Sequence, residues 1–288
     1  MKGLRTTWPA ATGGTGRYKC VVEETVKRWL LLKALKYLGF EKTDKIGVIV
    51  LKNPEKRNAL SFELLAELEE LVRKIATERE QRVVIIKGEG ECFSSGHDLR
   101  EILSKHPREV ERLFLKCFDV MKAIREAPQP YIAQVHGVAT AAGCQLVAAC
   151  DLAVAARSAR FSLPGVNIGL FCFTPTVFVS RNVLRKKAFE LAITGEMISA
   201  EEAFRIGLVN KVVEDEELEK ETMNLARKIS RFPLTVLESG KRFFYRQLFM
   251  EDFQALSYAT ETIALYSQAK EAIEGISAFL EKREPRWD

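Results

Sequence analysis

A chain of 288 residues, of which 47% are hydrophobic and 29% charged, can bury a sizeable core and suits one large or two modest domains. Its longest apolar runs stop short of the roughly 18 residues that a membrane helix needs, so we expect no membrane partner. The 44 basic side chains exceed the 39 acidic ones by only five, and the two signs are interspersed. This pattern argues against a nucleic-acid partner, which favours a strongly basic surface.

The six cysteines form no Cys-x-x-Cys pair, and several lie inside apolar runs, where cysteine behaves as a small hydrophobic residue. A reducing compartment fits this usage, so we expect a cytoplasmic protein. Residues 1–20 carry four basic side chains and no acidic one. We interpret them as an unstructured tail; the alternative is an organellar transit peptide, which would direct the protein to the mitochondrial matrix.

From residue 22 onward, helical and strand-like patterns alternate. Apolar residues at helical spacing predict helices, the second of them capped by Ser61, over 22–38, 61–75, 110–124 and 140–149. Short apolar runs rich in β-branched residues predict strands over 46–51, 83–86, 131–135 and 152–155. This alternation predicts an α/β core with parallel strand pairing.

The C-terminal third is predicted to be mostly helical. Helical periodicity recurs over 218–229, 235–248, 253–266 and 271–282. Because no linker rich in Gly or Ser interrupts the chain, we expect these helices to pack on the core or on a neighbouring subunit. We divide the chain into an N-terminal tail and helix (1–43), a core (44–200) and a C-terminal helical region (201–288).

Several common catalytic motifs are absent from the sequence. It contains no GxxxxGK[ST], no GxGxxG, no HExxH and no GxSxG. Its three histidines, His97, His106 and His136, lack the spacing of metal ligands, so we expect no metal site. These absences argue against kinase, dehydrogenase, zinc hydrolase and serine hydrolase activity.

Two glycine-containing turns follow predicted strands and open predicted helices, at residues 92–99 and 136–143. In the first, Asp98 is placed as a helix cap. In the second, the side chains shrink to almost nothing, which allows a ligand to approach the backbone closely. Two amides, one from each turn, would make an oxyanion hole, whose donors contribute about 3–4 kcal/mol each. The alternative is that small residues only permit tight helix-on-sheet packing.

Four segments of the sequence resemble those of the enoyl-CoA hydratase/isomerase (crotonase) superfamily: residues 53–60, 93–99, 137–151 and 195–213. The likeness covers roughly residues 44–287 in the expected order. It implies an α/β crotonase (ClpP-like) fold, a spiral of ββα units followed by a C-terminal helical trimerisation region. It also implies an acyl-CoA substrate, no cofactor beyond the CoA moiety of that substrate, and a homotrimer or homohexamer.

The resemblance assigns roles to individual residues. The backbone amides of His97 and Ala142 would hold the thioester carbonyl. CoA would contact two sets of residues, one on this chain and one on the C-terminal helices of a neighbouring subunit: Lys56, Arg57, Ala59, Ser95, Gly96, His97, Asp98 and Leu99 on the first, and Phe279 and Lys282 on the second. The alternative for Lys56 and Arg57 is a solvated turn without a ligand.

The sequence departs from the family pattern at the two positions that decide the chemistry. Hydratases of the family use two glutamates, and here those positions are Gln145 and Gly165. Hydration needs one group that takes a proton from water and one that delivers a proton to the α-carbon. A carboxamide does not exchange a proton at neutral pH and glycine has no side chain, so we expect weak hydration.

Two other residues are candidates to compensate. The imidazole of His97 stands beside its own oxyanion amide, and we leave a side-chain role and a purely backbone role open. Cys172 is interpreted as an inert thiol in the acyl pocket rather than a nucleophile, because apolar surroundings raise a thiol pKa. Three functions remain: an enzyme that needs only enolate stabilisation, such as a decarboxylase or thioesterase-like member; a weak hydratase/isomerase; and a non-catalytic acyl-CoA-binding or assembly protein.

Overall fold

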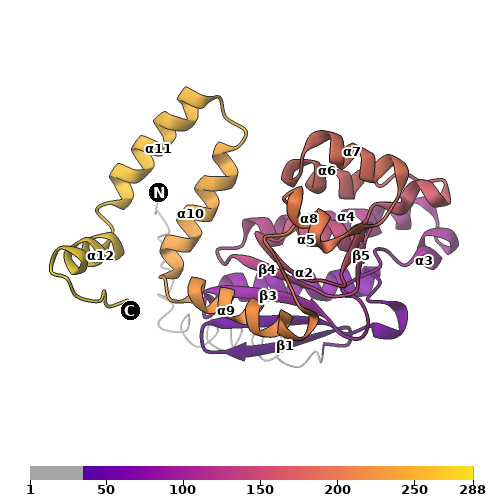
Figure 1. Cartoon of the computed structure of the whole chain (residues 1–288), viewed down its shortest axis with the longest axis horizontal. Helices are drawn as coiled ribbons and strands as arrows, with labels where there is room; N and C mark the ends of the chain where they lie inside the picture. Colours follow the sequence, from indigo (N-terminus) through magenta and orange to yellow (C-terminus); the bar gives the residue numbers. More distant parts are fainter. Residues whose placement is uncertain (1–34, 288) are drawn as a thin grey trace, which may run out of the picture. The chain divides into compact units, whose positions relative to one another are not determined.

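The computed structural model describes residues 35–287, and its centre is a six-stranded sheet with the order β1-β2-β3-β4-β6-β9 (Figure 1). β1 pairs antiparallel with β2, and every other neighbouring pair is parallel. The strands are β1 (Leu38–Thr43), β2 (Ile46–Leu51), β3 (Val83–Gly88), β4 (Tyr131–Val135), β6 (Leu152–Ala156) and β9 (Lys211–Val213). The predicted α/β core with parallel pairing is therefore confirmed.

A second, three-stranded sheet has the order β5-β7-β8 and was not predicted. Its strands have two or three residues each, too few to show a two-residue hydrophobic period: β5 (Val138–Thr140), β7 (Arg160–Ser162) and β8 (Ile198–Ser199). β5 occupies the first residue of the helix predicted over 140–149, so that helix, α5, starts later and spans Ala142–Ala149.

Helices cover both faces of the large sheet, which explains why its strands are apolar on both sides. One face packs against α2 (Phe62–Glu78), α4 (Pro107–Glu126) and α5. The other packs against α9 (Leu218–Ser230), whose Leu218 and Ala226 lie in the same cluster as the side chains of β2 and β3. Because β2 is buried at every position, its sequence reads as a continuous apolar run.

The remaining helices lie outside this layer or follow it in the chain. α3 (Leu99–Ser104), α6 (Phe173–Asn182), α7 (Arg185–Thr194) and α8 (Ala200–Arg205) belong to the α/β body. The C-terminal helices are α10 (Leu234–Gln247), α11 (Asp252–Tyr266) and α12 (Lys270–Leu280). The last three contain one buried residue between them, Ala278.

Two boundaries in the structure differ from those predicted from the sequence. The helix predicted over 22–38 lies outside the described residues up to position 34; from Leu35 to Tyr37 the chain is not helical, and Leu38 opens β1. The sheet also runs beyond the predicted core of 44–200, since β1 precedes it and β9 follows it. β9 is only three residues long and α9 has ordinary helical periodicity, so the sequence alone does not separate them from the C-terminal helices.

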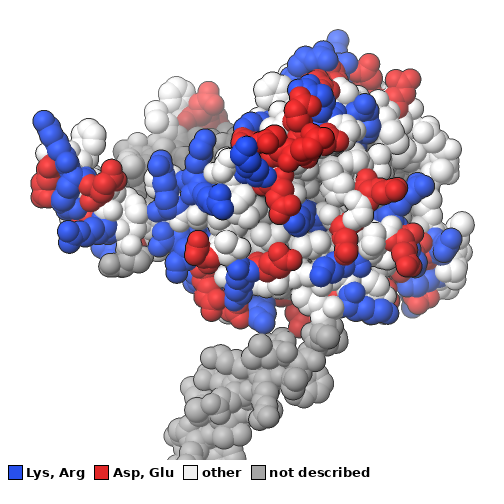
Figure 2. All heavy atoms as spheres, turned by 60° about the horizontal axis from the view of Figure 1, so that its bottom comes forward, with Lys and Arg blue, Asp and Glu red and all other residues white. Residues whose placement is uncertain are grey.

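The surface charges agree with the composition. On the face displayed in Figure 2, basic and acidic side chains are intermixed over the described residues. No helix in the described part of the chain is long and apolar enough to cross a membrane. The five cysteines of residues 35–287 are buried and form no disulfide with one another.

Candidate active site

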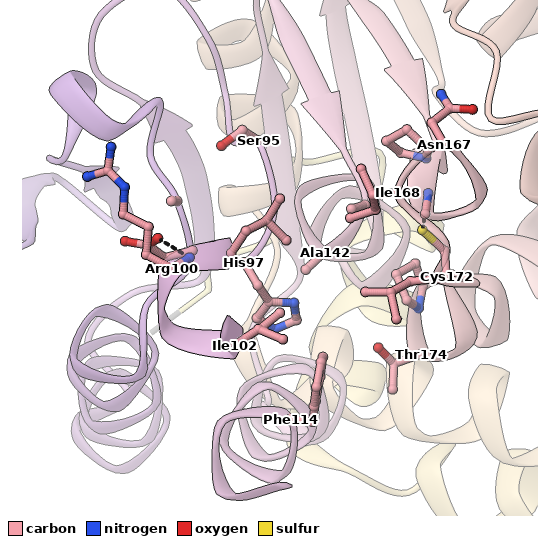
Figure 3. A pocket seen from close by; sticks show the side chains of 18 of the residues that line it. Ser95, His97, Arg100, Ile102, Phe114, Ala142, Asn167, Ile168, Cys172 and Thr174 are labelled. Atoms are coloured by element: carbon pink, nitrogen blue, oxygen red, sulfur yellow. Dashed lines mark hydrogen bonds between the residues drawn. The ribbon is translucent and has the colours of Figure 1, made fainter. Parts of the chain in front are cut away.

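One cavity of about 780 Å³ collects most of the predicted site residues (Figure 3). Five segments form it: the turn that begins at Glu55, the turn from Ser95 into α3, α4, the start of α5, and the segment 164–175. The predicted residues that line it are Lys56, Arg57, Ala59, Ser95, His97, Asp98, Leu99, Ala142, Gly165 and Cys172. Segments up to 120 positions apart in the sequence therefore meet as the resemblance implied.

Backbone hydrogen bonds hold the two predicted turns together. Ser94 forms a parallel bridge with Ala139, and Thr140 N donates to Ser94 O at 3.0 Å. At two further positions the turns come so close together that only glycine fits. At Gly96, where φ is +93°, a Cβ would lie 2.9 Å from Ala141 Cβ, and at Gly143 it would lie 2.3 Å from Ser94 O. The small residues thus serve close backbone packing as well as forming the cavity wall.

The amides of His97 and Ala142 have no acceptor within the described part of the chain. Ala142 is the first residue of α5, whose N-terminal amides have no partner within the helix. The preceding residue, Ala141, has φ +49° and ψ −119°, a strained conformation for a residue with a Cβ. This geometry suits a pair of donors aimed at an oxyanion.

The cavity lining includes the basic residues Lys56, Arg57 and Arg100. Lys56 Nζ lies 3.1 Å from Asp98 Oδ2, and Asp98 also caps α3 by accepting from Arg100 N at 3.0 Å. Burial acts to raise the pKa of Asp98, but these two hydrogen bonds outweigh it and hold the pKa below its usual value. Arg57 forms no ion pair with a described carboxylate, so its guanidinium is free to meet an anion.

The imidazole of His97 lies inside the cavity. It packs edge-on against the ring of Phe114, with the ring centroids 4.9 Å apart, and its Nε2 is buried without a hydrogen-bond partner among residues 35–287. Burial lowers the pKa of His97 to about 4, because the charged form loses hydration. The side chain is therefore neutral at physiological pH.

Cys172 occupies the space that a side chain at position 165 would need. Its Sγ accepts a hydrogen bond from Gly165 N at 3.3 Å, and a Cβ on Gly165 would lie 3.0 Å from Cys172 N, Cys172 Sγ and Leu170 O. Burial raises the pKa of the thiol, against a smaller lowering by the Gly165 amide. Cys172 lines the cavity, and its thiol is protonated at neutral pH.

The cavity holds few groups that could transfer a proton. Within the described lining, Glu55 and Asp98 are the only carboxylates, and Asp98 is already paired with Lys56. Gln145 does not line the cavity: it lies one turn into α5 with 2% of its surface exposed, and its Oε1 has no hydrogen-bond partner in the described part of the chain. Its assignment to the catalytic group is not supported by the placement of its side chain.

Three further predicted residues do not line the cavity within this chain. Gly96 supplies only the close approach described above. Phe279, 82% exposed on α12, and Lys282, just beyond it, lie outside the lining and were expected to act on a neighbouring subunit. Sequence reasoning missed Ile102, Phe114 and Thr174, which line the cavity from α3, α4 and α6. No motif marks them, because their place depends on how the helices pack.

A sequence profile described as enoyl-CoA hydratase/isomerase matches residues 41–288. The chain belongs to this family. Enoyl-CoA hydratase domain-containing protein 3, mitochondrial, of Mus musculus is 47% identical over 245 residues, which cover 85% of this chain and 82% of that protein. A short-chain-enoyl-CoA hydratase of Clostridium acetobutylicum is 31% identical over 245 residues, covering 84% of this chain and 94% of its own.

Solved structures of the family agree with the fold. An enoyl-CoA hydratase of Mycobacterium smegmatis has a TM-score of 0.85 at 46% identity and covers 87% of this chain and 98% of its own. Human enoyl-CoA hydratase domain-containing protein 3 has a TM-score of 0.85 at 45% identity and covers 88% and 100%, respectively. The crotonase fold that the sequence motifs implied is therefore confirmed.

Proposed function

We propose that this protein binds acyl-CoA thioesters and stabilises the enolate form of the thioester with the amides of His97 and Ala142. The observation that carries the proposal is the pair of unpartnered amides at one cavity, brought together by two turns that are more than 40 residues apart. As negative charge develops on the thioester oxygen, two fixed donors stabilise it more than they stabilise the ground state.

The basic turn gives CoA its orientation. CoA carries a 3′-phosphate and a pyrophosphate, and the guanidinium of Arg57 is suited to a phosphate because it offers a planar fork of donors. Lys56 is the neighbouring residue of the same turn and is paired with Asp98. With the CoA nucleotide bound at this basic turn, the thioester reaches the two amides and the acyl chain enters the part of the cavity formed by residues 164–175.

Hydration of an enoyl-CoA should be very slow. A missing general acid or base costs about 10²–10⁴-fold in rate, and neither hydratase position supplies one here. Decarboxylation is better suited to this cavity, because the departing carboxylate leaves its electrons behind and the oxyanion hole holds the resulting enolate. Thioesterase-like chemistry needs an activated water, for which the lining offers only His97 and two carboxylates.

A side-by-side assay tests the proposal. Hydration of crotonyl-CoA and decarboxylation of malonyl-CoA and methylmalonyl-CoA would be measured on the wild-type protein, with binding followed by calorimetry. We expect all the thioesters to bind, with an affinity that falls with salt and falls further in Arg57→Ala, and hydration to be the slower reaction. Binding with no turnover of any substrate would favour the non-catalytic acyl-CoA-binding alternative. Equal affinity in Arg57→Ala would contradict the role of the turn.

We also propose a homotrimer, or a dimer of trimers, in which Phe279 and Lys282 complete the CoA site of a neighbouring subunit. The many exposed apolar side chains of α10–α12 support it. For location we propose the mitochondrion, since the names of five relatives include the word mitochondrial. The expected cytoplasmic location has no support among these relatives. The basic, acid-poor composition of residues 1–20 is compatible with the transit-peptide alternative.

A further inference from the structure

The turn that carries Arg57 also holds the peptide group that presents the His97 amide. Leu60 N donates to Gly96 O at 2.7 Å, and Ser95 N donates to Arg57 O at 3.0 Å. In a planar trans peptide the carbonyl and the following N–H point in opposite directions. The bond to Gly96 O therefore sets the direction of the His97 N–H, and that direction depends on where Leu60 lies.

The side chain of Asn58 fixes this turn from two sides. It is fully buried, and both of its polar atoms are hydrogen-bonded. Its Oδ1 accepts from Asn53 N at 2.9 Å, a bond that closes the turn. Its Nδ2 donates to Glu89 O at 2.9 Å and to Cys92 O at 2.8 Å, in the segment that leads from β3 toward His97. One carboxamide thus joins the basic turn to the first oxyanion turn.

Ser94 strengthens the same connection. Its side chain is fully buried, and its hydroxyl donates to Asn58 O at 2.8 Å and accepts from Gly96 N at 3.3 Å. The backbone of Ser94 is also the part of this turn that bonds to Thr140 of the second turn. Asn58 is therefore connected through Ser94 to the chain on both sides of the oxyanion hole.

The backbone at this junction is strained. Arg57 and Asn58 have φ values of +52° and +50°, in the left-handed region that asparagine tolerates better than arginine. Such a conformation persists only where surrounding contacts hold it. Neither Asn58 nor Ser94 lines the cavity, so any effect that they have on a ligand is transmitted through their neighbours.

We propose that Asn58 is a positioning residue of the oxyanion hole, which acts through Ser94 and Leu60 to set the direction of the His97 amide relative to the turn that receives CoA. The proposal rests on the proposed function, because it assumes that this amide holds the thioester carbonyl. A misplacement of about 1 Å at a reacting centre costs about 10²-fold in rate, so a residue that does not touch the substrate can have a large effect.

Two variants, Asn58→Asp and Ser94→Ala, test the proposal. Asn58→Asp keeps the tolerance of positive φ and an oxygen for Asn53 N, but it has no donor for Glu89 O and Cys92 O. Ser94→Ala removes only a hydroxyl and carries the test if Asn58→Asp does not fold. The readout is the carbonyl stretching band of bound butyryl-CoA, isotopically labelled at the thioester carbon, in infrared difference spectra. CoA binding is measured in parallel by calorimetry.

In the wild type the bound carbonyl band should lie below that of free butyryl-CoA, because two donors polarise the carbonyl. Each variant should lose at least half of this downshift. CoA itself should bind each variant within about threefold of the wild-type affinity, since the bond that closes the basic turn is kept. The double variant should lose little more than either single one, because both changes break the same connection.

Asn182→Asp is the matched control. Asn182 also donates its amide to two carbonyls, Ala148 O and Phe178 O, but lies outside the cavity lining. The control should keep the wild-type band, which a general loss of hydrogen bonds would not predict. An unchanged band in both test variants, or an equal loss in the control, would overturn the positioning role and leave the proposed function standing. A wild-type protein that does not bind butyryl-CoA, or binds it without a downshift, would overturn the proposed function as well.

Discussion

The helices of the α/β body and the C-terminal helices both have apolar residues at helical spacing, but the two regions bury those residues to different extents. In the body, the apolar positions predicted for α2 are all buried, with Leu68 fully enclosed. In α10 and α11 no residue is buried, and Phe253 is 79% exposed. An amphipathic pattern therefore predicts that a helix has an apolar face. It does not say whether the same chain covers that face.

The largest effect is expected where the apolar face of α11 is made polar. Leu256 and Ile263, seven residues apart on one helical face, are 63% and 68% exposed. If they are covered by a second copy of the chain, Leu256→Glu with Ile263→Glu should convert trimers into monomers, as measured by light scattering. Glu261→Gln, an exposed polar change on the same helix, should keep the wild-type mass. A monomeric wild-type protein at micromolar concentration would contradict the proposed assembly.

A second change tests the polar connection between the two regions. Lys241 of α10 lies 2.8 Å from Asp151 Oδ2, with both side chains nearly buried, and also donates to Ile124 O and Gln129 O of the body. Lys241→Met removes the cation and leaves a buried carboxylate, which should cost about 3–5 kcal/mol in the free energy of unfolding.

Urea unfolding of Lys241→Met would measure that loss. Adding Asp151→Asn to Lys241→Met should recover a large part of it, because the remaining buried group is then uncharged. An unfolding free energy within about 1 kcal/mol of the wild type in Lys241→Met would show that the pair does not hold α10 to the body.

One pH effect should come from a single buried side chain of the body. The pKa of His97 is lowered from 6.5 to about 4 in the folded protein by burial, so the unfolded chain takes up this proton first as the pH falls. The unfolding free energy should drop between pH 6.5 and pH 4, by at most about 3 kcal/mol from this group. His97→Phe should show a smaller drop over this range, whereas the α11 double variant should keep the wild-type drop. An unaltered pH dependence in His97→Phe would contradict the burial of the imidazole.

The smallest effect is expected at the strained residue of the second turn. Ala141 has a positive φ of +49°, which glycine adopts at less cost than alanine. Relief of this strain in Ala141→Gly should therefore raise the unfolding free energy by about 1 kcal/mol. The greater entropy of glycine in the unfolded chain subtracts from that gain. The urea midpoint measures this change. A fall in the midpoint would show that the Ala141 Cβ contributes more packing than strain.

Much of the fold could be predicted from the sequence, because long elements buried on one or both faces repeat their hydrophobic pattern. β2, β3, β4 and α2 are examples. The strands of the small sheet could not be predicted, since two or three residues hold no period. Motifs marked the turns around His97 and Ala142, where backbone geometry restricts the residue types. They did not mark Phe114 or Thr174, which line the cavity only because α4 and α6 pack beside those turns.

One measurement tests the central claim most directly: the turnover of crotonyl-CoA hydration by the unaltered protein. With Gln145 outside the cavity lining and Gly165 crowded by Cys172, we expect a rate at least ~10²-fold below the ~1–10³ s⁻¹ of ordinary enzymes, in a protein that still binds the thioester. Gln145→Glu alone is the simpler partner measurement, because a side chain at position 165 would bring its Cβ to 3.0 Å from Cys172 Sγ and the neighbouring backbone. A wild-type rate within the ordinary range would contradict the claim and show that another group of the cavity, such as His97 with a bound water, transfers the proton.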